Sequence, residues 1–207
     1  MYNKPIIVFE GIETSGKSYH IKNVSNYLKK KKIKFIKIRE PGGSSNSEKI
    51  RRLILNNSSN FNKNTDLLLY LAARSENIDK IIKKNYKKKI ILIDRFIDST
   101  LAYQHFGMGI NKQLIEINNK FILQSIKSDF TFLNLVSKKN LILRLTKRSK
   151  LNRYDKFKTN FYLKVQNGFI KISNTNKKKY LKINSNLDIS VNKKIIIHKV
   201  KSILNLK

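Results

Sequence analysis

Short runs of consecutive apolar residues recur along the chain and predict buried β-strands. The first run, Pro5-Ile6-Ile7-Val8-Phe9-Glu10, is apolar at successive positions rather than at alternate ones. Such a run is typical of a strand covered on both faces, as in a parallel sheet. We expect five strands, at residues 5–10, 33–38, 89–94, 129–135 and 179–184.

Between these runs, apolar residues recur at helical spacing. Ile21, Val24, Tyr27 and Leu28 form one such stripe. We expect helices near residues 17–31, 45–56, 64–86, 111–127, 138–148, 156–174 and 190–205. Strands that alternate with helices form βαβ units. The expected fold class is therefore α/β, with a five-stranded parallel sheet flanked by helices and ligands bound at the carboxyl ends of its strands.

Length and composition fit one domain over residues 1–207. The chain is 40% hydrophobic, and no apolar stretch approaches the roughly 18–20 residues of a membrane span. Cysteine is absent, which excludes disulfides and thiolate metal sites. Because no secretory pattern precedes the first strand, we expect a cytoplasmic protein without a membrane partner.

A net charge of +32 would by itself favour nucleic acid as a partner. However, only eight of the 45 basic residues are Arg, and Lys, Asn and Ile are all abundant, which indicates an A+T-rich coding sequence. The lysine runs 29–32, 87–89 and 177–179 lie at predicted helix ends or loops. We therefore expect a solvated basic surface with salt-sensitive, non-specific polyanion binding and no specific nucleic-acid partner.

The first predicted strand leads into a phosphate-binding loop of the form G-x-x-x-x-G-K-[ST], placed between a strand and a helix as this motif requires. Its residues are Gly11, Ile12, Glu13, Thr14, Ser15, Gly16, Lys17 and Ser18. The glycines let the backbone wrap a phosphate, and the loop N–H groups attract negative charge. Lys17 is expected to reach the β- and γ-phosphates of ATP, and the Ser18 hydroxyl to bind Mg²⁺.

The third predicted strand ends in Asp94 and Arg95. An aspartate at this position beside a phosphate loop is a usual Mg²⁺ partner, and the Arg95 guanidinium suits bidentate contact with a phosphate. Ser99 and Tyr103 follow at steps of four and would share a helix face with Arg95, while Gln104 adds an amide. The alternative is a surface ion pair beside a core tyrosine.

Two other segments give weaker signals. Arg39 and Pro41 belong to an Arg-Glu-Pro-Gly-Gly turn after the second strand, which alone could be an ordinary surface turn. Tyr70 and Arg74 are four residues apart on one helix face and could stack on a base and bond its carbonyl, although Tyr70 also fits a core position.

A basic segment near residues 144–156 contains Arg144, Arg148 and Arg153. As a lid, it could close over the triphosphate, and arginines there would neutralise charge on the transferring group. The alternative is a solvated basic helix end.

Together these motifs resemble the thymidylate kinases, which transfer a phosphoryl group from MgATP to dTMP in dTTP synthesis. The matching stretches are E-G-x-E-x-x-G-K-[ST] at 10–18, R-E-P-G-G at 39–43, A-A-R at 72–74 and D-R-x-x-x-S-x-x-A-Y-Q at 94–104. The resemblance extends to about residue 170. It implies a P-loop nucleoside monophosphate kinase fold and a homodimer.

The resemblance also implies contacts with the sugar and the phosphates. Glu13 would approach the 3′-hydroxyl and the metal region, and Tyr103 would pack beneath the sugar. Arg39 and Arg95 would hold the substrate phosphate. The chain resembles the bacterial type, in which the lid rather than position 14 supplies arginines, and this implies catalytic roles for Arg148 and Arg153. The family's Asp-Arg-x-Glu pattern reads Asn-Arg-Tyr-Asp at 152–155 here.

For the base, the resemblance implies a second set of contacts. Pro41 would line the pocket for the thymine methyl, and Tyr70 would stack on the ring. Arg74 would bond a thymine carbonyl, while Ser99 and Gln104 would read the base edge. The remaining alternatives are another nucleoside monophosphate or deoxynucleoside kinase, and a non-enzymatic basic P-loop protein that binds nucleic acid.

Overall fold

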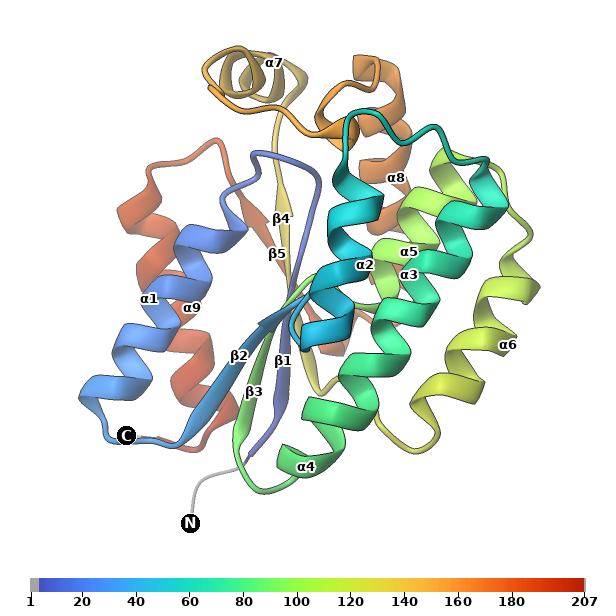
Figure 1. The fold of residues 1–207 in the computed structure, drawn as a ribbon. Coiled ribbons are helices and arrows are strands. Elements are labelled where there is room, and N and C mark those ends of the chain that lie inside the picture. Colours follow the sequence, from blue (N-terminus) through green and yellow to red (C-terminus); the bar gives the residue numbers. More distant parts are fainter. Residues whose placement is uncertain (1–3, 207) are drawn as a thin grey trace.

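The computed structural model describes residues 4–206 and has a five-stranded sheet at its centre (Figure 1). The strand order is β2-β3-β1-β4-β5, and every neighbouring pair is parallel. The strands are β1 (Ile6–Glu10), β2 (Phe35–Arg39), β3 (Ile90–Asp94), β4 (Phe130–Leu135) and β5 (Tyr180–Asn184). The predicted sheet is confirmed, with boundaries shifted by at most two residues.

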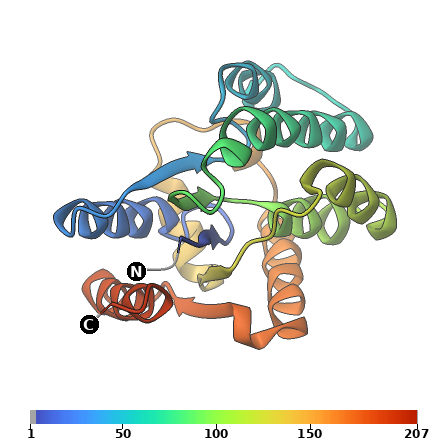
Figure 2. The same ribbon diagram turned by 90° about the horizontal axis from the view of Figure 1, so that it is seen from below.

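Helices cover both faces of this sheet (Figure 2). In β1, Ile7 and Phe9 pack toward α1 (Lys17–Lys30) and α9 (Ile189–Ile203), whereas Ile6 and Val8 pack in a separate cluster on the opposite face. All four side chains are at most 1% exposed. Consecutive apolar residues are therefore needed because both faces of the strand are buried.

The opposite face carries most of the remaining helices (Figure 1). They are α2 (Ser45–Leu55), α3 (Lys63–Asn77), α4 (Lys83–Asn85), α5 (Ile97–Thr100), α6 (Lys112–Leu123) and α8 (Thr159–Thr175). Helix α7 (Lys138–Thr146) lies near the carboxyl edge of the sheet, at the top of Figure 1. In residues 4–206, no helix is long and apolar enough to cross a membrane.

Two helical segments differ from the sequence prediction. The single helix expected at 64–86 is interrupted by a π-helical turn at Ile78–Ile82, which separates α3 from α4. The second difference follows β3, where the sequence suggested a helix only through the spacing of Arg95, Ser99 and Tyr103. There α5 continues into a second π-helix, Leu101–Gly107. Periodicity did not predict this segment, because a π-helix departs from the 3.6-residue repeat.

The central strands bring the predicted motifs together. β1 lies between β3 and β4, and Phe9 is paired with Asp94 in the register of β1 and β3. The phosphate loop after β1 and the Asp94-Arg95 pair therefore emerge at the same carboxyl edge. In open parallel sheets this edge is where ligands bind.

Candidate active site

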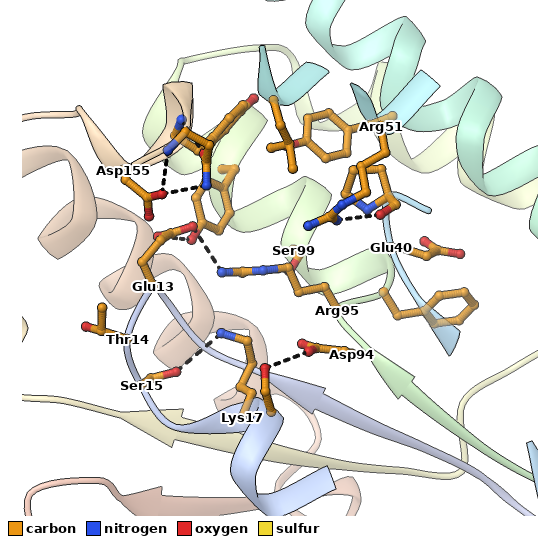
Figure 3. Close-up of a pocket in the computed structure, with 18 of the residues that line it drawn as sticks. Glu13, Thr14, Ser15, Lys17, Glu40, Arg51, Asp94, Arg95, Ser99 and Asp155 are labelled. Atoms are coloured by element: carbon orange, nitrogen blue, oxygen red, sulfur yellow. Dashed lines mark hydrogen bonds and ion pairs between the residues drawn. The ribbon is translucent and has the colours of Figure 1, made fainter. Parts of the chain in front are cut away.

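A pocket of about 430 Å³ lies at the carboxyl edge of the sheet. Its walls come from the phosphate loop, the end of β3, helices α2 and α3, the π-helix at 101–107 and the segment after α7 (Figure 3). Of the predicted site residues, it is lined by Glu13, Thr14, Ser15, Gly16, Lys17, Ser18, Pro41, Tyr70, Arg74, Asp94, Arg95, Ser99, Tyr103, Gln104 and Arg148.

The phosphate loop folds around the amine of Lys17. Lys17 Nζ donates hydrogen bonds of 2.8 Å to the carbonyl oxygens of both Gly11 and Ile12. Burial lowers the pKa of Lys17 to about 8, and the nearby charge of Arg95 acts in the same direction. An anionic phosphate in the loop would compensate this buried charge. Gly11 and Ile12 themselves do not line the pocket. The Ile12 side chain packs in the core instead.

Only glycine fits at position 11. Its φ is +139°, and a Cβ atom there would lie 2.4 Å from the backbone oxygen of Asn134 on β4. The close approach of loop and strand thus depends on the missing side chain.

Ser18 and Asp94 form a small oxygen site, and Asp94 lies beside Lys17 (Figure 3). Ser18 Oγ donates to Asp94 Oδ2 at 3.3 Å. Within residues 4–206, no three His, Asp or Glu side chains are grouped so that they could hold a metal ion. The Ser18 and Asp94 oxygens fit Mg²⁺, which prefers hard oxygen ligands, usually takes only one or two protein groups and completes its shell with phosphate and water.

Arg95 occupies the middle of the pocket, next to Lys17 (Figure 3). Its guanidinium donates to the Gly11 carbonyl at 2.8 Å and to Glu13 Oε1 at 3.1 Å. The Arg95 guanidinium lies over the ring of Tyr103, with its carbon atom 5.1 Å from the ring centre. The Tyr103 hydroxyl donates to Glu13 Oε2 at 2.6 Å. Glu13, Arg95 and Tyr103 therefore form one connected group of polar side chains.

Arg74 also lines the pocket, and three hydrogen bonds hold its guanidinium in place. It is 2% exposed. Its guanidinium donates to Glu40 Oε2 at 2.7 Å, to Asn119 Oδ1 at 2.7 Å and to the Phe96 carbonyl at 3.1 Å. Burial raises the pKa of Glu40, while the charge of Arg74 opposes that shift. A buried arginine fixed by three acceptors suits specific recognition of a ligand carbonyl.

Aromatic rings form the wall beside Arg74. The rings of Tyr70 and Tyr154 meet edge to face, with centroids 5.8 Å apart, and Tyr154 also lies 6.0 Å from Tyr103. Gln104 donates to the Tyr154 hydroxyl at 3.4 Å. Flat apolar faces with polar groups at their edges fit a nucleobase.

Three predicted residues are placed differently from their expected contacts. Arg39 lies outside the pocket and pairs with Glu48 at 3.1 Å, with about half of its side chain exposed. Arg153 also lies outside and pairs with Asp66. Ser99 lines the pocket, but its hydroxyl donates inward to Glu10.

Nine residues that line the pocket were not selected by the sequence interpretation, and two of them, Arg51 and Thr100, bear directly on ligand binding. Arg51, on α2, donates to the Pro41 carbonyl at 2.6 Å. The Thr100 hydroxyl is buried and has no hydrogen-bond partner within the described part of the chain, which fits a contact with a ligand. Arg51 could have been found from its residue type, because arginine is rare in this lysine-rich chain. Thr100 had no signal of its own.

The segment after α7 closes the pocket from above. Arg148 pairs with Asp155, which also accepts from the backbone and side chain of Asn152. Tyr154 donates its hydroxyl to Asp66 Oδ2 at 2.8 Å. Arg144, by contrast, donates to the carbonyls of Thr14 and Ser185 and has a structural position.

Comparison with known proteins agrees with this geometry. The profile of the family "Thymidylate kinase" matches residues 9–196. A thymidylate kinase of Thermosipho africanus is 40% identical over 81% of this chain and 83% of its own, and one of Acholeplasma laidlawii is 36% identical over 94% and 97%. The crystal structure of thymidylate kinase from Ehrlichia chaffeensis superimposes with a TM-score of 0.77, 30% identity and coverage of 95% and 98%. The chain therefore belongs to the thymidylate kinase family of nucleoside monophosphate kinases.

Proposed function

We propose that the pocket binds ATP at the phosphate loop and dTMP between Arg95 and Arg74, and that it catalyses phosphoryl transfer to give dTDP. The observation that carries this proposal is that Lys17 and Arg74 line the same pocket. Lys17 identifies the phosphate-donor end, and Arg74 with the aromatic wall of Tyr70 identifies a base site. Arg95 lies between them, where an acceptor phosphate would stand.

The reaction needs no general base in the protein. A phosphate monoester has a second pKa of about 6, so its oxygen is largely unprotonated at neutral pH. Catalysis therefore depends on holding the two phosphates in line and neutralising their charge. Lys17 would act on the donor and Arg95 on the acceptor. Bound Mg²⁺, held by Ser18 and Asp94, would supply further charge neutralisation.

We propose that residues 144–156 act as a lid, with Arg148 as the lid arginine that would contact the phosphates. Arg148 lines the same pocket as Lys17, and its partner Asp155 is buried. On ATP binding, Arg148 could exchange this partner for phosphate oxygens. Arg153 would instead anchor the lid through Asp66.

We also propose a homodimer in the cytoplasm. Exposed apolar side chains gather on α3 and α6, which pack side by side (Figure 1). They are Leu68, Leu114, Ile117 and Phe121, exposed by 62, 48, 67 and 80%. A second copy of the chain would cover this face, as apolar patches of this kind usually mark an interface.

The direct test is ADP release from MgATP with a panel of nucleoside monophosphates. Stimulation by dTMP well above that by dCMP, dGMP or thymidine is expected, because the base site is closed by fixed polar groups. Equal stimulation by several monophosphates would favour another monophosphate kinase. Absence of stimulation in protein that still binds ATP would contradict the proposal.

A further inference from the structure

Glu10 has no place in the proposed chemistry, yet its carboxyl group lies directly behind Arg95. It is fully buried at the end of β1. Glu10 Oε1 accepts the backbone N–H of Phe96 at 2.7 Å and that of Ser99 at 3.3 Å. Glu10 Oε2 accepts the Ser99 hydroxyl at 2.6 Å. One carboxyl group thus satisfies three donors of the segment that carries Arg95.

The backbone at Arg95 needs such support. Its φ is +65°, in the left-handed region that residues with a Cβ atom rarely adopt. That conformation persists only where neighbouring contacts impose it. The Arg95 N–H donates to the carbonyl of Phe9 at 3.0 Å, and the following N–H, that of Phe96, donates to Glu10. The turn is therefore fixed on both sides by consecutive residues of β1.

We propose that Glu10 is a positioning residue that clamps the Phe96 and Ser99 amides and thereby aims the Arg95 guanidinium at the acceptor phosphate. The clamp depends on the reach of Oε1, since both amides bind that oxygen. It does not depend on a negative charge at Glu10. This inference rests on the proposed role of Arg95.

Two conservative variants separate reach from charge. Glu10→Gln keeps the length and one carbonyl oxygen but loses the charge. Glu10→Asp keeps the charge but withdraws the oxygen by one methylene. We expect Glu10→Gln to retain kcat/KM for dTMP within about twofold, and Glu10→Asp to lose about tenfold or more, because two buried amides lose their acceptor. The affinity for ATP should change little in either variant.

A matched control is Asp129→Asn. Asp129 also accepts a backbone N–H of β1, that of Ile6 at 2.7 Å, but at the far end of the strand. The Asp129→Asn substitution should leave dTMP kinetics unchanged. A reversed order, with Glu10→Asp active and Glu10→Gln impaired, would overturn the clamp. So would equal effects in the two variants.

A double-mutant cycle tests whether Glu10 acts through Arg95. Glu10→Asp combined with Arg95→Lys should be no worse than Arg95→Lys alone, whereas additive losses would overturn the inference. If Arg95→Lys alone has no effect on dTMP kinetics, the proposed role of Arg95 fails instead. Should Glu10→Asp not fold, amide hydrogen exchange decides: the Phe96 N–H must exchange slowly in both the unchanged chain and Glu10→Gln, and rapid exchange in either overturns the clamp.

Discussion

Arg51 and Arg52 are neighbours on α2, but they lie in different surroundings. Arg51 is half-buried at the pocket and touches the Pro41 carbonyl, whereas Arg52 is exposed and does not line the pocket. Burial lowers the pKa of Arg51, and the charge of Arg39 lowers it further. An anionic phosphate in the pocket would relieve this uncompensated charge.

We predict that Arg51→Ala raises KM for dTMP or lowers kcat/KM by about 10- to 100-fold, which corresponds to a charged hydrogen bond of roughly 1.5–3 kcal/mol. Arg52→Ala removes the same charge from the same helix and should change kcat/KM less than about twofold. Steady-state kinetics with dTMP varied at saturating ATP measures both. Similar losses in the two variants would indicate a general effect of charge.

Buried ionisable residues near the pocket predict a pH-dependent stability. Burial and the neighbouring Asp98 raise the pKa of Glu10 from 4.5 to about 8, and burial raises that of Asp98 to about 6. The folded state therefore binds more protons than the unfolded state, and this stability is lost as pH rises through these values. Burial lowers the pKa of His20 to about 4, which acts oppositely below pH 6.5.

Between pH 6.5 and 7.5, Glu10 should dominate, because Lys17, whose pKa burial lowers to about 8, acts oppositely only near pH 8 and above. We predict that the free energy of unfolding falls over this window, by at most about 1.4 kcal/mol per pH unit. Glu10→Gln should flatten the fall, because Gln does not titrate. Urea unfolding at four pH values measures the slope. An unchanged slope in Glu10→Gln would show that other groups cause it.

At the scale of elements, the lid is anchored to α3 by a single carboxylate. Asp66 accepts the hydroxyl of Tyr154 and pairs with Arg153, and it is 3% exposed. Both lid contacts lie within three residues of the buried Asp155. The segment that we propose closes over the phosphates is thus held to α3 through Arg153 and Tyr154 rather than through Arg148.

We predict that Asp66→Ala loosens the lid. Trypsin should cleave after Lys147 or Lys150 about fivefold faster or more, since a loss of about 1 kcal/mol changes an opening equilibrium by that factor. ATP hydrolysis without dTMP should also rise, because an open lid admits water. Asp79→Ala is the matched control: Asp79 is an exposed carboxylate in the π-helical turn after α3. Equal cleavage in both variants would contradict the anchor.

Over the whole molecule, exposed apolar side chains are unevenly distributed on the surface. Helices α3 and α6 carry the most exposed apolar side chains, led by Phe121 at 80%, whereas Ile189, Val191 and Ile195 on α9 are exposed by 41–44%. The net charge of +32 repels copies of the chain from one another, so association must come from apolar burial that outweighs this repulsion. Raised salt should therefore strengthen the proposed dimer, because it screens the repulsion.

We predict that Ile117→Lys, on α6, converts the proposed dimer to a monomer, since it places a charge in the face that a second copy would cover. Ile195→Lys, on α9, adds the same charge to a side chain that is 41% exposed and should leave the dimer intact. Light scattering after size-exclusion chromatography at 0.3 M salt gives the mass of each. A monomer for the unchanged chain would refute the proposed assembly.

The sequence predicted most of the architecture. The five strands are confirmed, because runs such as Ile90 to Ile93 are apolar without interruption and can only be buried on both faces. The phosphate loop was found because its glycines, lysine and serine are required at fixed spacing. Residues 101–107 could not be predicted as a π-helix, since their conformation is set by packing against α8 rather than by local preference.

The sequence by itself determined the sheet, the phosphate loop and the family, since each is written in local pattern and spacing. Only the tertiary structure decided which charged side chains face the pocket. In the folded chain, Arg39 pairs with Glu48 and Arg153 pairs with Asp66, whereas Arg51 lines the pocket. The physical reason is that an arginine's direction depends on carboxylates and carbonyls supplied by residues distant along the chain. Such partners become neighbours only when the whole sheet and its helices have assembled.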